Sequence, residues 1–357
     1  MFNVNLTRRE FIKEAGSATF AVAAFSTLWN TLTGSAEASA FESVEDIANI
    51  DWDTNPAIQV PNYGCYAGWH GQISGGYRFE SQETIDKKVI FYEQNSGKLP
   101  AIWSFMRLGL RTDFFPTNVC EAMKNRGIVP QIRHYFSPMW KEVAAAKHDK
   151  MIQGFALNAK KFGSPFILIP YPEANSSHKK RHPYAGGNGK DFYKAYKHIR
   201  QIFRDVGANN AVFGLHLNPY PQHQEINSFM LDPVDFDWIG FSAYNHESWG
   251  QDNSLMDLSL NWYTWAKNNY PKKPIALFEL GSSDTSSQGK WIADAYGRIK
   301  KQLPRIKLVE WAEVGFGPLE GEKDDSTYFN DVGSIAYRQV LSDPYFIGGP
   351  LDFLSKI

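Results

Sequence analysis

Two glutamates stand where an apolar segment gives way to polar sequence. Glu173 closes the segment "FILIPYPE" and Glu279 closes "PIALFE". Two carboxyl groups that face each other across a cleft can cleave a glycosidic bond, because one protonates the leaving oxygen while the other attacks the anomeric carbon. Each glutamate taken alone could equally be a solvated charge at the end of a strand. The elements around them must decide between these readings.

Eight apolar segments with strand composition alternate with segments of helical spacing. The strands are expected at residues 63–68, 100–108, 128–136, 166–171, 211–219, 237–245, 274–282 and 306–316. The clearest helix is "KDFYKAYKHIRQIFRDVG", in which one face is apolar and Gly207 is the stop signal. Other helices are expected near 82–95, 117–126, 143–161, 257–269, 288–301 and 329–341.

Eight strands that alternate with helices predict an α/β fold, a (β/α)₈ TIM barrel, in which the active site lies at the C-terminal ends of the strands. The competing fold is a doubly wound open sheet, which would bind a nucleotide through a Gly-rich first turn. No G-x-G-x-x-G motif follows a strand in this sequence, so the barrel is favoured.

The barrel would place the two glutamates on opposite sides of its ring, after the fourth and the seventh strand. Side chains alternate along a strand. Ile275 and Leu277 share a face with Glu279, and Ile167 and Ile169 share a face with Glu173. If both strands stay regular, each glutamate is expected to point up the barrel axis.

Glutamates that end strands four and seven of such a barrel resemble the clan A retaining glycoside hydrolases. Within that clan the chain resembles glycoside hydrolase family 26, the β-mannanase-like enzymes. The likeness rests on "PEANSS" with the helix and fifth strand that follow, on "DWIGFSAYNHESWG", on "KPIALFELGSS" followed by "KWIADAY", and on "KLVEWAEVGF". These motifs are short, but their order is specific, and the likeness covers most of residues 60–345.

The resemblance implies roles for individual residues. Glu173 would be the acid/base and Glu279 the nucleophile, with Tyr244 hydrogen-bonded to the nucleophile. Trp311 would form the floor of the subsite for the attacked sugar, and Trp249 would lie on the substrate side. Simple packing in the barrel or under a loop is the alternative for these three aromatic residues. His216 and Asn218, after strand five, could face the barrel mouth and touch substrate, or could be satisfied core residues.

Pro172 departs from the family pattern, which usually has His before the acid/base glutamate. Proline has no N–H donor and fits poorly inside a central strand. Strand four is therefore expected to end near Ile169 and to continue as a loop. The leading function is an exported, retaining endo-glycoside hydrolase acting on a β-linked polysaccharide. Alternatives are a hydrolase that serves an exopolysaccharide export system and a catalytically weakened barrel that binds glycans.

The first forty residues resemble a twin-arginine export signal. Arg8 and Arg9 lie in "TRREFIK", an interrupted apolar stretch follows, and Ala38-Ser39-Ala40 is a cleavage site. The apolar part is shorter than a membrane-spanning helix requires. The sequence thus predicts export through the twin-arginine machinery, a single catalytic domain over residues 41–357, no stable membrane insertion after cleavage, and a periplasmic or secreted location.

The amino-acid composition indicates which classes of binding partner are favoured. The formal net charge of the 357 residues is −1, which does not favour nucleic-acid binding. Aromatic residues make up 15 % of the chain, a content that suits stacking on sugar faces as well as a large core. The two cysteines, Cys65 and Cys120, are too few for a disulfide scaffold, although one disulfide is possible. No cofactor and no metal are implied.

Three further features have weaker signals. His178 and His182 have the spacing of a metal pair on a helix, but Pro183 and the polar residues around them predict a loop. Lys179, Lys180 and Arg181 lie between these histidines, and on the rim of the cleft they would attract an acidic polysaccharide. A merely solvated loop with a neutral glycan as substrate is the favoured interpretation. Glu310 and Glu313 are carboxylates near strand eight to which no role is given.

Overall fold

A computed structural model provides the structure of the chain. It describes residues 42–71, 82–107, 114–136, 139–176, 188–220, 225–247, 250–283, 285–316 and 325–351. All of them belong to one compact unit, Glu42–Ile357. The predicted export signal, Trp249 and the loop from His178 to His182 lie outside the described residues and stay predictions.

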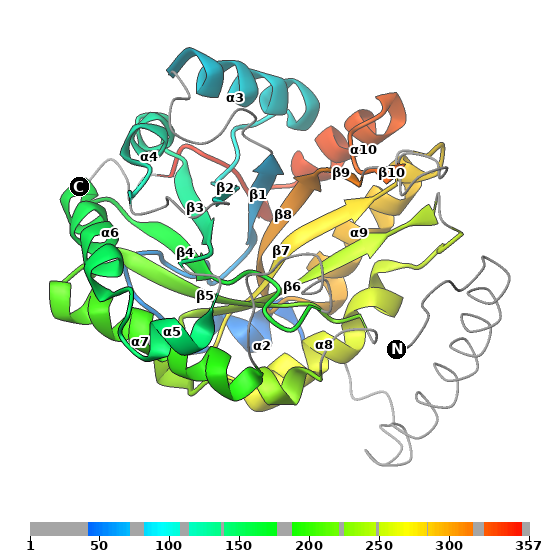
Figure 1. Ribbon diagram of the computed structural model, residues 1–357. Coiled ribbons are helices and arrows are strands. Elements are labelled where there is room, and N and C mark those ends of the chain that lie inside the picture. Colours follow the sequence, from blue (N-terminus) through cyan, green and yellow to red (C-terminus); the bar gives the residue numbers. More distant parts are fainter. Residues whose placement is uncertain are drawn as a thin grey trace, which may run out of the picture. The chain divides into compact units, whose positions relative to one another are not determined.

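Eight parallel strands close into a barrel with helices around it (Figure 1). Each strand pairs with the next, and β1 pairs with β8 to close the ring. The predicted barrel is confirmed, and the open doubly wound sheet is wrong because that sheet would not close. The strands are β1 (Cys65–Gly71), β2 (Ile102–Arg107), β3 (Val129–His134), β4 (Phe166–Pro170), β5 (Ala211–Leu217), β6 (Trp238–Asn245), β7 (Ile275–Ser282) and β8 (Ile306–Glu313).

The helices around the barrel follow the predicted segments with one exception. The segment 143–161, expected as one helix, forms two, because Ala146 takes a left-handed φ of 64° between them. The helix before β5 begins at an Asn188 cap and ends at Gly207, whose left-handed φ of 73° makes it the predicted stop. The helices are α3 (Gln82–Ser96), α4 (Thr117–Lys124), α5 (Trp140–Ala144), α6 (Asp149–Phe162), α7 (Gly189–Val206), α8 (Leu255–Asn269), α9 (Gln288–Gln302) and α10 (Asp331–Leu341).

Smaller elements lie around the barrel, and the sequence patterns did not predict them as separate elements. The strand expected at 306–316 is shorter than predicted, because β8 ends at Glu313 and the last two residues form β9. Short strands have too few residues for a period to be read. These elements are α2 (Val44–Ala48), the 3₁₀ turns η2 (Ile226–Phe229) and η3 (Pro233–Asp235), the paired strands β9 (Gly315–Phe316) and β10 (Asp325–Ser326), and β11 (Phe346–Ile347), which pairs with β1.

The core has two layers because both faces of each strand are covered. The outer layer packs the strands against the helices and includes the aromatic residues Trp103, Tyr196 and Phe213. The inner layer fills the barrel and consists mainly of Ile102, Val129, Ile167, Ile169, Val212, Trp238, Ala276, Phe278 and Leu308. Side chains alternate between the two layers along each strand, so a residue two positions after an inward residue also points into the barrel and can reach its mouth.

Phe278 fills much of the barrel interior at the expense of two neighbouring side chains. A Cβ atom on Gly240 would lie 2.3 Å from the Phe278 ring, and one on Gly214 would lie 3.0 Å from it. Glycine at these two positions of β5 and β6 therefore makes room for a ring contributed by β7.

No helix among the described residues combines the length and the apolar character needed to cross a bilayer. Cys65 and Cys120 are both buried, in β1 and α4.

Candidate active site

Glu279 reaches the barrel interior because β7 contains one extra residue. The pairing with β6 steps from Phe241–Leu277 directly to Ser242–Glu279, so Phe278 has no partner and forms a bulge. Ile275 and Leu277 belong to the outer layer. A regular strand would have turned Glu279 outward with them. The expectation that Glu279 points inward by simple alternation is therefore wrong in its reason, although its position at the mouth is as expected.

Glu173 reaches the same space from a turn after β4. Ile167 and Ile169 point into the barrel as expected, but β4 ends at Pro170 and Tyr171 takes a left-handed φ of 58°. Tyr171 consequently packs outward against Trp140. Glu173 also has a left-handed φ, 49°, an uncommon conformation that non-glycine residues hold mainly where tertiary contacts impose it.

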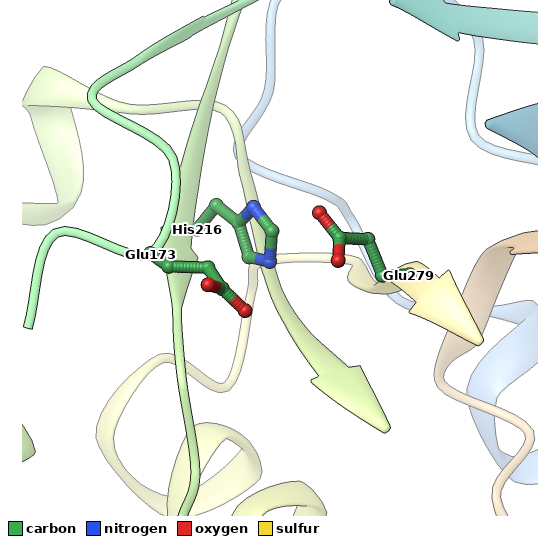
Figure 2. A group of neighbouring side chains, drawn as sticks. All are labelled: Glu173, His216 and Glu279. Carbon is green, nitrogen blue, oxygen red and sulfur yellow. The ribbon is translucent and has the colours of Figure 1, made fainter. Parts of the chain in front are cut away.

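The two carboxyl groups and the imidazole of His216 lie together at this end of the barrel (Figure 2). One oxygen of each glutamate and one ring nitrogen of His216 all lie within 4.8 Å of one another. Figure 2 shows the imidazole between the carboxyl groups, with Glu173 on the loop after β4 and Glu279 on β7. The structure thus brings together two glutamates that are separated by more than a hundred residues in the chain.

Neutral donors surround Glu173. The Ser242 hydroxyl donates to Oε1 at 2.6 Å and the Asn218 amide donates to the same oxygen at 2.8 Å. Burial raises the pKa of Glu173 to about 7, and the negative charge of Glu279 adds to this effect, while the bond from Ser242 opposes it. In the described part of the chain both donors reach Oε1 and none reaches Oε2. Oε2 is therefore the oxygen that can hold and deliver a proton.

Glu279 has charged and strongly polar donors instead. The Arg133 guanidinium, from β3, donates to Oε1, and the Tyr244 hydroxyl, from β6, donates to Oε2 at 2.5 Å. Burial opposes the charge on Arg133, but Glu279 and Glu310 outweigh it, so the pKa of Arg133 is raised. Burial and the charge of Glu279 hold the pKa of Tyr244 well above its usual value, so Tyr244 stays a donor. These contacts stabilise Glu279 as the anion.

His216 is buried and neutral. Burial lowers the pKa of His216 well below its usual value, and the charge of Arg133 adds to this. Its Nε2 lies 2.9 Å from the Ser242 hydroxyl, which already donates its one proton to Glu173, so Nε2 carries the imidazole proton. The network thus assigns a chain of donors from His216 through Ser242 to Glu173.

Asn175 fastens the turn that carries Glu173. Its side chain accepts from the backbone N–H of Asn218 at 2.7 Å and donates to the Asn218 carbonyl at 2.8 Å. Asn218 in turn contacts Glu173. The loops after β4 and β5 are therefore joined by a side chain that pairs with backbone as a strand would. Because the Asn218 side chain donates to Glu173, Asn218 orients the candidate acid.

Trp311 lies elsewhere than the resemblance implied. Its ring is fully buried on the outer side of β8, stacked on Phe329 at 5.0 Å between centroids and near Tyr337 of α10. Its indole nitrogen donates to the Thr327 carbonyl at 3.1 Å. A ring with no exposed face cannot stack on a sugar, so the expectation that Trp311 forms a subsite floor is wrong. The residues of β8 that face the barrel are its neighbours in alternation, which include Glu310.

Several residues of the site escaped the sequence reasoning. Arg133 and Ser242 lie on the inner faces of β3 and β6, as the inward neighbours Val129 and Trp238 show. An arginine with the same parity as inward apolar residues is a signal that could have been read from the sequence. The pairing of Asn175 with Asn218 had no such signal, because it depends on the turn after β4.

Glu173, His216 and Glu279 are also ligand types that a divalent cation accepts. A cation bound there would compete with the donors on both oxygens of Glu279 and would lie beside the Arg133 guanidinium. The same competition would break the Ser242 bonds to His216 and Glu173. The donor set therefore fits a proton donor beside a stabilised anion better than it fits a cation.

Comparison with known proteins supports the fold. No family model matches the chain, and no curated protein matches it. Among solved structures, a β-mannanase from a symbiotic protist of the termite Reticulitermes speratus is 13 % identical with a TM-score of 0.56, covering 80 % of this chain and 89 % of that one. A family 26 β-mannanase from Bacteroides ovatus is 17 % identical with a TM-score of 0.54, covering 82 % and 93 %. An endo-β-1,4-mannanase from Cellulomonas fimi is 13 % identical with a TM-score of 0.56, covering 82 % and 73 %. The chain therefore shares its (β/α)₈ barrel fold with these solved structures.

Proposed function

We propose that the protein is a retaining endo-glycoside hydrolase that cleaves a β-linked polysaccharide. The observation that carries the proposal is the proximity of the two carboxyl groups, one oxygen of each lying within 4.8 Å of the other. Retaining glycosidases hold their carboxyl groups about 5–5.5 Å apart, whereas inverting enzymes leave roughly 6.5–9.5 Å for a water. The spacing supports double displacement.

The different surroundings of the two glutamates support their roles. Glu173, with a pKa raised to about 7 by burial and by Glu279, keeps a proton near neutral pH and donates it to the glycosidic oxygen. Glu279, stabilised by Arg133 and Tyr244, attacks the anomeric carbon and forms a covalent glycosyl ester. Glu173, now ionised, then takes a proton from water, which attacks the same carbon and releases the sugar with retained configuration.

The comparisons and the site support a first substrate class to test. The similar structures are named as β-mannanases, and one of them was solved with a gluco-manno-oligosaccharide. A β-mannan or a β-glucan is therefore the first class to test. Pro172, at the position next to the candidate acid, has no N–H or side-chain donor for a sugar hydroxyl. We expect the sugar preference to differ from that of enzymes with His at this position.

Export completes the proposal. Arg8 and Arg9 precede an apolar stretch and a small-residue cleavage site, and a twin-arginine signal would carry the protein to the periplasm or beyond. A fusion of residues 1–45 to a reporter that is active only after twin-arginine export tests this point. Replacing both arginines with Lys should keep the reporter in the cytoplasm. Export of the Lys variant at the wild-type rate would contradict the signal.

The decisive experiment is incubation with β-mannan, glucomannan, mixed-linkage β-glucan and xylan, followed by product analysis. Cleavage with retention, read by ¹H NMR of the first-formed anomer, is the expected result. Release of the inverted anomer would replace double displacement with an inverting mechanism. Binding of a glycan without release of any product would favour the alternative of a glycan-binding barrel, to which the missing donor at Pro172 points.

A further inference from the structure

Glu310 lies beneath the candidate site and shares an arginine with Glu279. It is fully buried on β8, and its Oε2 accepts from Arg133 Nη2 at 3.1 Å and from the Gln131 side chain at 2.8 Å. Arg133, also fully buried, donates through its other terminal nitrogen to Glu279. One guanidinium therefore bridges two carboxyl groups, one at the site and one below it.

The charges in this cluster do not balance if both carboxyl groups are ionised. Arg133 is the one cation that contacts either of them in the part of the chain that the structure describes. Two buried anions against one cation leave an excess negative charge away from water, which is costly. A proton on one carboxyl group removes the excess. Glu310 is the better candidate for the proton because it is fully buried, whereas Glu279 opens onto the site.

The hydrogen bonds of Glu310 agree with this assignment. Arg133 and Gln131 both donate to Oε2, while Oε1 has no hydrogen-bond partner among the described residues, although the nearby Ser104 hydroxyl lowers the pKa of the carboxyl group. An ionised oxygen without a donor would be strongly disfavoured in this position. Burial raises the pKa of Glu310 to about 8, and the charge of Arg133 and the hydrogen bond from Ser104 oppose this rise without cancelling it. At neutral pH the neutral acid is therefore the main form.

We propose that Glu310 is a positioning residue that acts on Glu279 through Arg133. With its proton on, Glu310 leaves the guanidinium charge to Glu279 and so keeps the candidate nucleophile ionised and oriented. When Glu310 ionises, it competes for Arg133 and loosens the hold on Glu279. The proposal rests on the function proposed for Glu279, and it adds an alkaline limit to the active form that does not come from Glu173.

The groups around Glu310 do not change their own protonation near pH 8, so a titration in this cluster belongs to Glu310. On β1, burial and Arg133 lower the pKa of His70 well below its usual value, so His70 is neutral. On α3, burial raises the pKa of Tyr92 well above its usual value. Ser104 on β2, 2.8 Å from His70 Nδ1, and Gln131 on β3 do not titrate. Arg133 and Glu279 are then the charged partners that respond when Glu310 loses its proton.

The test is ¹³C NMR of the full chain labelled at the glutamate Cδ atoms, followed from pH 5 to pH 9.5. Glu310→Gln identifies the Glu310 signal by its disappearance, and Glu279→Gln identifies that of Glu279. The expected result is a Glu310 step near pH 8 with a simultaneous change in the Glu279 signal. A Glu310 step below pH 5, or a Glu279 signal that does not change in the Glu310 step, would overturn the proposal.

Glu313→Gln is the matched control. Glu313 lies on the same strand and is also buried, and burial raises its pKa to about 7, but it shares the outer face of β8 with Trp311. Removing this carboxyl group should leave the coupled step of Glu310 and Glu279 in place. Loss of the coupled step in Glu313→Gln would mean that general burial, and not Arg133, connects the signals, and it would also overturn the proposal.

A kinetic arm links the titration to the reaction. Glu173→Gln removes the alkaline limb that comes from loss of the Glu173 proton, and 2,4-dinitrophenyl β-mannobioside and β-cellobioside need no proton on leaving. In this background the single-turnover rate should fall above about pH 8. The added Glu310→Gln should remove that fall, whereas Glu310→Leu should lower the rate at every pH. A fall that persists with Glu310→Gln would overturn the proposal. Failure of both glycosides to react would count against the proposed function, and the NMR step would still decide the role of Glu310.

Discussion

The ends of β4 and β7 deliver the same residue type to the same space by different backbone devices. On β7 one bulged residue, Phe278, shifts the alternation so that Glu279 turns inward while the strand continues to Ser282. On β4 the strand stops at Pro170, and two left-handed residues redirect the chain to Glu173. Glu279 therefore sits on a rigid strand and Glu173 on a turn that is held by side chains.

The surroundings differ as much as the backbones. Glu279 contacts a buried guanidinium, a charge that favours the anion, while Glu173 contacts only neutral donors among the described residues. Environments that separate two carboxyl groups in this way define an acid and a nucleophile. The contrast teaches that the roles are set by side chains from other strands, since Arg133 comes from β3 and both Ser242 and Tyr244 come from β6. The predictions below test this contrast.

The largest effect is expected for Glu279→Ala. Removing a nucleophile from a covalent mechanism costs on the order of 10⁵-fold in kcat. Sodium azide should restore part of the rate, because it enters the vacated space and attacks the anomeric carbon directly, giving an inverted glycosyl azide. The measurement is kcat on the best glycan of the panel, with ¹H NMR of the azide product. Turnover near the wild-type rate would show that Glu279 is not the nucleophile. A circular dichroism spectrum like that of the wild type is the control for folding.

Glu173→Ala should have a smaller and substrate-dependent effect. General acid catalysis contributes about 10²–10⁴-fold, so the loss on a polysaccharide should be of that size, while 2,4-dinitrophenyl glycosides should form the glycosyl ester almost normally. In the wild type, kcat/KM should fall as pH rises above about 7, because the proton of Glu173 is lost through the pKa that burial and Glu279 raise. Equal losses on both substrate classes would deny Glu173 the acid role.

Much of the fold could be read from the sequence, because strands buried on both faces produce continuous apolar segments and the intervening helices have one apolar face. The barrel, the position of both glutamates at strand ends and the contact of Tyr244 with Glu279 followed from that reading and from the resemblance. The inward turn of Glu279 was expected for the wrong reason, because it depends on a bulge at Phe278, which packs over Gly214 and Gly240, and not on regular alternation. Trp311 was misplaced for a related reason, since its parity puts it under α10.

Ser242→Ala should sharpen the contrast by a modest amount. The Ser242 hydroxyl stabilises ionised Glu173, so its removal raises the pKa of Glu173 further. The alkaline limb of kcat/KM should move up by about one pH unit, a shift that corresponds to one hydrogen bond to a charged group. Ser259→Ala, which changes a buried serine of α8, is the matched control and should leave the limb in place. An alkaline limb that shifts to lower pH, or that does not shift, would show that the Ser242 hydroxyl does not stabilise ionised Glu173.

The smallest effect on activity is expected for Trp311, because it belongs to the outer packing layer of β8 and not to the candidate site. Trp311→Ala should lower the free energy of unfolding by about 3–5 kcal/mol, the usual result of truncating a large buried aromatic side chain. Its KM should nevertheless stay within about twofold of the wild type, because the ring stacks on Phe329 and has no face open to a sugar. Trp311→Phe keeps an aromatic ring in the layer and serves as the second variant if the alanine variant does not fold. Urea unfolding followed by fluorescence, together with initial rates on the same glycan, measures both quantities. A KM that rises tenfold while stability is unchanged would return Trp311 to the substrate site and break the distinction between the two faces of β8.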